Sequence, residues 1–102
     1  MDTDLDYRKK AKELFEKWEN KFLNFDPDEI EASLTQGSLV FVLKQKNKVI
    51  LSMQPPLRQI WLAVAHKGIA LHFEWDANSQ TWIDDKTKSI ELENYLSNLF
   101  KT

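Results

Sequence analysis

The chain lacks cysteine altogether and is poor in glycine, proline and histidine, with 2 Gly, 3 Pro and 2 His among 102 residues. Without cysteine there are no disulfides, no thiolate catalysis and no cysteine-held metal or iron–sulfur cluster. Any bound metal ion must therefore take oxygen or histidine nitrogen as its ligands. The single, separated glycines Gly37 and Gly68 exclude a glycine-rich phosphate loop.

An excess of charge of one sign and a long hydrophobic run are also missing. The 14 Lys+Arg and 16 Asp+Glu residues give a formal net charge of -2, whereas phosphate binding needs a clustered cationic surface. We therefore expect no general nucleic-acid binding. No stretch resembles a membrane span, and the acidic start Met1-Asp2-Thr3-Asp4 has the wrong charge for a signal peptide or transit sequence. We expect a cytoplasmic protein, or a mature organellar one.

Catalytic machinery is scarce in this sequence. His66 and His72 are the only histidines, and neither sits in a nucleophile-and-base motif. A zinc site would need carboxylates for most of its ligands. We therefore expect that the protein is not an enzyme. The 42% of hydrophobic and 29% of charged residues are ordinary for one globular domain spanning residues 1–102, a length sufficient for a single core.

The first part of the chain predicts a long amphipathic helix from Asp4 to about Asn24. Asp4 and Asp6 favour its start because carboxylates are stabilised near the positive end of the helix dipole. Pro27 forces its end, since the residue before a proline disfavours helical backbone. The apolar residues recur at intervals of three and four, which places them on one stripe: Tyr7, Ala11, Leu14, Phe15, Trp18, Phe22 and Phe25.

The middle of the chain predicts six short strands, from alternation of apolar and polar residues and from β-branched runs. They are expected around Ile30–Leu34, Leu39–Lys44, Lys48–Gln54, Gln59–Val64, Ile69–Trp75 and Thr81–Asp84. In the hairpin turn of residues 45–47, Asn47 is expected in the left-handed conformation. Pro55-Pro56 ends the third strand because proline has no amide donor. Strands this close in sequence should pair antiparallel.

The chain closes with a second helix, which we expect to be capped by Ser89. Its inward-facing residues should be Leu92, Leu96, Leu99 and Phe100. Helix, strands and helix give an α+β fold, in which an antiparallel sheet of about six strands carries both terminal helices on one face. The covered face should hold Val49, Leu51, Met53, Ile60, Leu62, Leu71 and Phe73.

The opposite face should expose Gln54, Gln59 and Trp61, by alternation along the third and fourth strands. An indole beside uncharged amides is typical of a protein-interaction hot spot more than of an ordinary solvated face. The plainer alternative is that Trp61 covers a neighbouring strand, since large aromatics are usually at least half buried. Base stacking by surface aromatics is a third use, which the acidic balance of the chain disfavours.

The segment that carries this surface resembles the central signature of the frataxin family. The run Gln54-Pro55-Pro56-Leu57-Arg58-Gln59-Ile60-Trp61-Leu62 is similar to the family's Q-x-P-x-x-Q-[IV]-W-L segment, which crosses from the third to the fourth strand. The similarity continues in Phe73-Glu74-Trp75 and in Trp82, and the order of elements agrees from Tyr7 to about Phe100. The resemblance implies a frataxin-like α/β sandwich.

The resemblance also implies a role in iron–sulfur cluster assembly, in which the protein binds the cysteine desulfurase and its scaffold protein and regulates sulfur transfer or supplies iron. It implies a monomer in the bacterial cytoplasm, with iron-dependent oligomers and the mitochondrial matrix as alternatives. The partner surface would comprise Ser52, Gln54, Arg58, Gln59, Trp61 and His72. Ser52 stands where the family usually has asparagine, so a contact made by that amide should be weaker here. His72 stands where the family often has a basic residue, with simple solvation as the alternative.

Weak binding of Fe2+ or Fe3+ is implied at carboxylates of the first helix and first strand, which here are Glu13, Glu16, Glu19, Asp26, Asp28, Glu29 and Glu31. Carboxylate oxygens are hard ligands suited to iron, and an exposed cluster without a preorganised cage should bind loosely. Lysines interleave the helix acids, so Glu13 with Lys17, or Lys12 with Glu16, has the spacing for mutual neutralisation.

For the helix acids, a salt-bridged solvated face is therefore an equal alternative to a metal site. The acids from Asp26 to Glu31, without lysines between them in the sequence, are the stronger candidates. The turn Asp84-Asp85 could also hold a cation, although acids beside a turn are more often backbone caps. A metal-independent adaptor that uses the Trp61 face is the alternative function.

Overall fold

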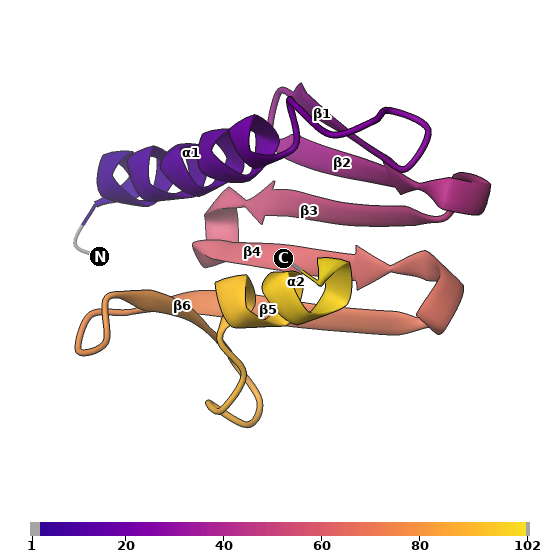
Figure 1. Cartoon of the computed structure of the whole chain (residues 1–102). Coiled ribbons are helices and arrows are strands. Elements are labelled where there is room, and N and C mark those ends of the chain that lie inside the picture. The colour runs from indigo at the N-terminus through magenta and orange to yellow at the C-terminus, as the bar shows by residue number, and fades with distance from the viewer. Residues whose placement is uncertain (1–2, 102) are drawn as a thin grey trace.

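The computed structural model describes residues 3–101, which form six strands between two terminal helices (Figure 1). Met1 and Asp2, part of the acidic start, lie outside the described residues. Single 3-10 turns, labelled η, join some of the strands. The elements are α1 (Asp4–Lys21), β1 (Ile30–Thr35), β2 (Ser38–Leu43), η1 (Lys44–Lys46), β3 (Lys48–Gln54), η2 (Pro55–Leu57), β4 (Gln59–Val64), η3 (Ala65–Lys67), β5 (Ile69–Asp76), β6 (Thr81–Asp84) and α2 (Leu92–Phe100).

The sheet is a simple antiparallel meander in the order β1-β2-β3-β4-β5-β6. Figure 1 shows α1 and α2 lying in front of the same sheet face, which leaves the other face free of helices. The expected α+β fold is thereby confirmed. Within the described range, neither helix is long and apolar enough to cross a membrane.

The core lies between the helices and the covered sheet face. The α1 stripe from Tyr7 to Trp18 is buried as expected, and Trp18 is only 1% exposed. Met53 and Leu71 pack against the core while remaining partly exposed. The fully covered sheet residues are Leu39, Phe41, Val49, Leu51, Ile60, Leu62, Val64 and Phe73. Burial of this one face, set by the period of two along each strand, fixes which side chains the other face presents.

Helix α1 is shorter than the sequence predicts, because it ends at Lys21 and not near Asn24. Its last turn tightens into i→i+3 hydrogen bonds, with the Phe22 and Leu23 N–H groups donating to Glu19 and Asn20 at 3.2 Å. Such 3-10 bonds satisfy the final carbonyls while the chain turns back toward β1. Phe25 thus leaves the buried stripe and is 43% exposed, with its ring against Phe22 at a centroid distance of 4.8 Å.

Helix α2 is capped by Glu91, so the prediction of a Ser89 cap is wrong. The Glu91 carboxylate accepts hydrogen bonds from the N–H groups of Glu93 at 2.8 Å and Asn94 at 3.0 Å. These are two of the donors that a helix start leaves without intrahelical partners. The Ser89 hydroxyl is paired with the Thr87 hydroxyl at 2.7 Å, and the Ser89 N–H donates to Asp84.

The β2–β3 hairpin also departs from the prediction. Gln45 and Lys46 take the left-handed conformation, with φ of 70° and 66°, whereas Asn47 is extended at φ -67°. The tight connection fixes which positions need positive φ, and the main-chain bond between the Leu43 N–H and the Asn47 carbonyl at 2.7 Å closes the turn. Register therefore overrides the local preference of asparagine here.

The crossover from β3 to β4 is tied to α1 by one phenol. The Tyr7 hydroxyl donates to the Gln59 carbonyl at 2.6 Å and accepts from the Gln54 N–H at 3.0 Å. Tyr7 is fully buried, and its ring meets Trp82 edge to face at 6.1 Å. Burial raises the pKa of the phenol, and the bond from the Gln54 N–H offsets part of this rise. The phenol thus stays protonated and can donate to the carbonyl.

The loop between β6 and α2 is built around Asp84, which is 2% exposed. One carboxylate oxygen accepts from the N–H groups of Ser89 at 3.0 Å and Ile90 at 2.7 Å. The other accepts from the N–H of Thr87 at 2.8 Å and from its hydroxyl at 2.7 Å. Burial alone would raise the pKa of Asp84, but these donors outweigh it and hold the pKa well below its ordinary value of 3.8. Asp84 is therefore a backbone cap.

Tyr7→Phe should lower the free energy of unfolding by about 1–3 kcal/mol, because the part-buried Gln54 N–H and Gln59 carbonyl lose their shared partner. Urea unfolding measures this loss. Tyr95→Phe is the matched control, since no bond to the Tyr95 hydroxyl is found within residues 3–101. Equal unfolding midpoints for the two variants would contradict the structural role of the Tyr7 hydroxyl.

Asp84→Asn should lower the urea midpoint at about pH 7. Each carboxylate oxygen accepts from two donors, and the NH2 group of an amide would replace one of these oxygens with a donor. Folding lowers the pKa of Asp84, so its stabilisation is full above the ordinary value of 3.8 and is lost as pH falls toward the lowered pKa. The gap between wild type and variant should therefore narrow toward about pH 3. Glu13→Gln, at an exposed carboxylate in the middle of α1, controls for loss of one charge. A difference in urea midpoint that does not change with pH would contradict the role of ionised Asp84 in stabilising the fold.

Candidate partner surface on the helix-free face

Strand register gathers five of the six predicted partner-binding residues into two adjacent rows. Ser52 on β3 pairs with Trp61 on β4, which pairs with His72 on β5. In the next row Gln54 pairs with Gln59. The odd–even alternation puts all five on the helix-free face, opposite the buried Ile60 and Leu62. We refer to these five residues as the Trp61 surface.

The Trp61 indole is held in place by two neighbours and is partly buried. Its ring stacks on the His72 imidazole with centroids 4.1 Å apart and planes 11° from parallel. Its N–H donates to the side-chain carbonyl of Gln59 at 2.9 Å. The indole thus covers a residue of the neighbouring strand, as the plainer alternative has it, while remaining on the accessible face. His72 is not an isolated imidazole, because the indole covers one side of its ring, and its side chain remains 38% exposed.

Arg58, the sixth predicted residue, lies at the end of the sheet and outside the two rows. It follows η2 in the left-handed conformation, with φ 52°, and its N–H donates to the Pro55 carbonyl at 3.1 Å. A left-handed residue with a Cβ costs roughly 1–2 kcal/mol. Beside it Leu57 is 60% exposed, so the crossover presents an apolar and a cationic side chain together.

The predicted acids of α1 are exposed or partly exposed and share their surface with lysines. Lys12 lies 3.8 Å from Glu16, as the spacing predicts. The expected Glu13–Lys17 pair is replaced by a tertiary one, because Lys17 reaches Glu93 of α2 at 2.8 Å. The Trp18 indole N–H donates to the same Glu93 carboxylate oxygen at 2.9 Å, so two donors of α1 meet one acceptor of α2.

The acids from Asp26 to Glu31 are exposed, but two of them are already engaged. The Asp26 carboxylate accepts from the Asp28 N–H at 2.9 Å, and Lys44 lies 3.8 Å from Glu29. The β1–β2 pairing brings this lysine beside acids that have no lysine between them in the sequence. Among residues 3–101 no three Asp, Glu or His side chains gather as a metal-binding group. The donor set fits loose, exposed contact with a hard cation and does not form a closed cage.

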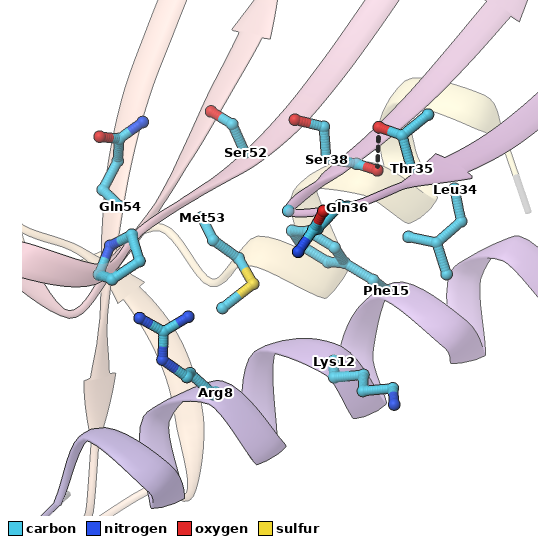
Figure 2. A pocket seen from close by; sticks show the side chains of 12 residues that line it. Arg8, Lys12, Phe15, Leu34, Thr35, Gln36, Ser38, Ser52, Met53 and Gln54 are labelled. Atoms are coloured by element: carbon cyan, nitrogen blue, oxygen red, sulfur yellow. Dashed lines mark hydrogen bonds between the residues drawn. The ribbon is translucent and has the colours of Figure 1, made fainter.

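A cavity of about 620 Å³ lies between α1 and the ends of the first three strands (Figure 2). Its floor is apolar, with Phe15, Leu34 and Met53 facing it. Arg8 and Lys12 stand at its helix side, but Arg8 is already paired with Asp4 at 2.7 Å. Among residues 3–101, no acid or histidine lines this cavity.

One residue of the helix-free face was missed by the sequence analysis as a part of the surface. Asp85 follows β6, and its carboxylate accepts from the Gln59 side-chain N–H at 3.1 Å. The same oxygen lies 3.9 Å from the His72 ring nitrogen. The alternation beyond Asp84 could have placed Asp85 on this face, but only the β5–β6 pairing brings it across β5 to Gln59.

Comparison with known proteins agrees with this architecture. The family model of the frataxin-like domain matches residues 1–102. A protein of Pseudomonas fluorescens named iron-sulfur cluster assembly protein CyaY is 38% identical over 63% of this chain and 58% of its own length. A CyaY protein of a second strain of that species is 35% identical over 76% of this chain and 69% of its own. The match thus covers less than two thirds of the first relative.

A solved structure supports the same family. The frataxin of Psychromonas ingrahamii superimposes with a TM-score of 0.81 at 26% sequence identity, over 97% of this chain and 90% of that one. Coverage of 97% of this chain includes the sheet, whose strands β3, β4 and β5 carry the Trp61 surface. The chain therefore belongs to the frataxin family.

Proposed function

We propose that this protein is a non-catalytic accessory protein of iron–sulfur cluster assembly, working in the bacterial cytoplasm as a single domain of residues 1–102 and as a monomer. Membership of the frataxin family and the name carried by its CyaY relatives support the pathway. Its partners would be the cysteine desulfurase and the scaffold protein, and its effect either regulation of sulfur transfer or supply of iron. The observation that carries the docking proposal is the Trp61 surface.

The Trp61 surface has the chemistry of a protein-binding hot spot. None of its five members is an acid, a lysine or an arginine, and they lie on strands, which hold them more rigidly than a loop would. Stacking and a hydrogen bond fix the indole before any partner arrives. A fixed aromatic side chain loses little conformational entropy on binding, so it can contribute more to affinity. The amide of Gln54 and hydroxyl of Ser52 would then orient the partner.

The acids of α1 and of residues 26–31 would form a second, electrostatic contact region. Exposed carboxylates at this end of the molecule would steer a basic partner surface and hold iron weakly as cargo. Weak binding is expected because Lys12 and Lys44 each lie 3.8 Å from an acid of the proposed set. Those same lysines favour the alternative function, a metal-independent adaptor that needs only the Trp61 surface.

Trp61→Ala should weaken binding to the desulfurase–scaffold complex by roughly 2 kcal/mol or more while leaving the fold nearly intact. Trp18→Ala is the comparison, since Trp18 is 1% exposed in the core and its loss should cost about 3–5 kcal/mol of stability. Thermal unfolding and binding are measured for each variant and the wild type. The assignment is wrong if Trp61→Ala melts as early as Trp18→Ala, or binds with wild-type affinity.

Neutralising Asp28, Glu29 and Glu31 to the matching amides should weaken both iron binding and partner association, and the effect on association should fade with added salt. Amide signals of residues 26–31 should broaden first when Fe2+ is added, with a similar pattern for Mn2+. Asp26 is left unchanged because its carboxylate holds the turn. Neutralising Glu13, Glu16 and Glu19 provides a matched triple with the same change of charge. Broadening centred on His66 and His72 would show that the iron ligands lie elsewhere.

A further inference from the structure

Asp85 is placed by its backbone to face the helix-free side of the sheet. Its N–H donates to the His72 carbonyl at 2.9 Å, which extends the β5–β6 pairing by one residue. The preceding Asp84 is turned inward and organises the loop through both its oxygens. Alternation then directs the Asp85 carboxylate outward, where its side chain is 28% exposed.

The Asp85 carboxylate decides which way the Gln59 amide is turned. An ionised carboxylate can only accept hydrogen bonds, so the group of Gln59 that faces it at 3.1 Å must be the NH2. The amide carbonyl then points the other way, where it accepts from the Trp61 N–H at 2.9 Å. An indole N–H can only donate. Both bonds of the Gln59 amide, to Asp85 and to Trp61, therefore require the same amide orientation. We refer to these two bonds as the relay from Asp85 to Trp61.

The same carboxylate also faces the second neighbour of the indole. Its oxygen is 3.9 Å from the His72 ring nitrogen, and the imidazole covers one face of the indole at 4.1 Å. Gln59 fixes the edge of the Trp61 ring that carries the N–H, and His72 fixes one ring face. One face and the N–H edge of the indole are thus engaged within the chain.

We propose that Asp85 is a positioning residue for partner recognition, which acts through Gln59 to hold the Trp61 indole in its binding orientation. The proposal rests on the proposed function for the identity of the partner. The claim that Asp85 orients the indole concerns this chain alone. Without Asp85 the Gln59 amide can turn over and present NH2 to the indole N–H, two donors facing each other. The indole then loses its anchor and must be ordered again when the partner binds.

The first measurement needs no partner. In Asp85→Ala, the 1H–15N signal of the Trp61 indole N–H should shift, and its hydrogen exchange should become faster. The signal is assigned by its loss in Trp61→Phe, and those of Trp18, Trp75 and Trp82 serve as internal references. Asp85→Asn retains one acceptor oxygen and should preserve most of the wild-type signal. An unmoved Trp61 signal in Asp85→Ala would overturn the proposal, as would a general shift of all four indole signals.

The second measurement is a double-mutant cycle on binding to the desulfurase–scaffold complex. Asp85→Ala should weaken binding on the order of fivefold, the scale for ordering one flexible side chain, but should add little in a Gln59→Ala background. The same fivefold loss in both backgrounds would show that Asp85 contacts the partner directly and would overturn the relay. Lys86→Ala, at the next position, is the control for a general effect of this loop.

The two measurements separate failure of the inference from failure of the proposed function. If the wild-type protein does not bind the desulfurase–scaffold complex, the proposed function fails, and the indole signal alone decides whether Asp85 positions Trp61. If Trp61→Ala abolishes binding while Asp85→Ala binds as wild type, the proposed function stands and the positioning role is overturned.

Discussion

The hydroxyl of Tyr7 is the contact on which the surface of this protein depends. It joins α1 to both ends of the β3–β4 crossover, by accepting from the Gln54 N–H and donating to the Gln59 carbonyl. Two consecutive prolines remove amide donors at this point, and a single main-chain bond, from the Arg58 N–H to the Pro55 carbonyl, closes the turn itself. A buried helix residue therefore holds the two glutamines in register, and their side chains emerge on the far face of the sheet.

From this constraint the two sheet faces take different roles. One is covered by both helices and supplies the core, so its side chains contribute to stability. The other is free of helices, and its side chains are ordered by one another: the His72 ring, the Gln59 amide and the Asp85 carboxylate all act on Trp61 or on its neighbours. Order on this face comes with only partial burial, which leaves the indole both positioned and accessible.

Much of the fold and part of the candidate site follow from the sequence by simple periodicity. The α1 stripe, the strand faces and the placement of Gln54, Gln59 and Trp61 need only the periods of helix and strand. Predictions of end positions failed where hydrogen bonds between non-neighbouring groups compete with local preference. Ser89 is a good cap by residue type, but its hydroxyl pairs with that of Thr87, and Glu91 caps α2 instead.

The sequence by itself determined the class of fold, the buried face and, through the run from Gln54 to Leu62, the resemblance to the frataxin family. Only the tertiary structure decided which side chains form ion pairs and hydrogen bonds with one another. Lys17 turns from Glu13 to Glu93, Lys44 comes to Glu29, and Asp85 reaches Gln59 across a strand. The physical reason is that alternation fixes the direction of a side chain, whereas its partner depends on strand register and helix docking. Both of these are set by packing of the whole core.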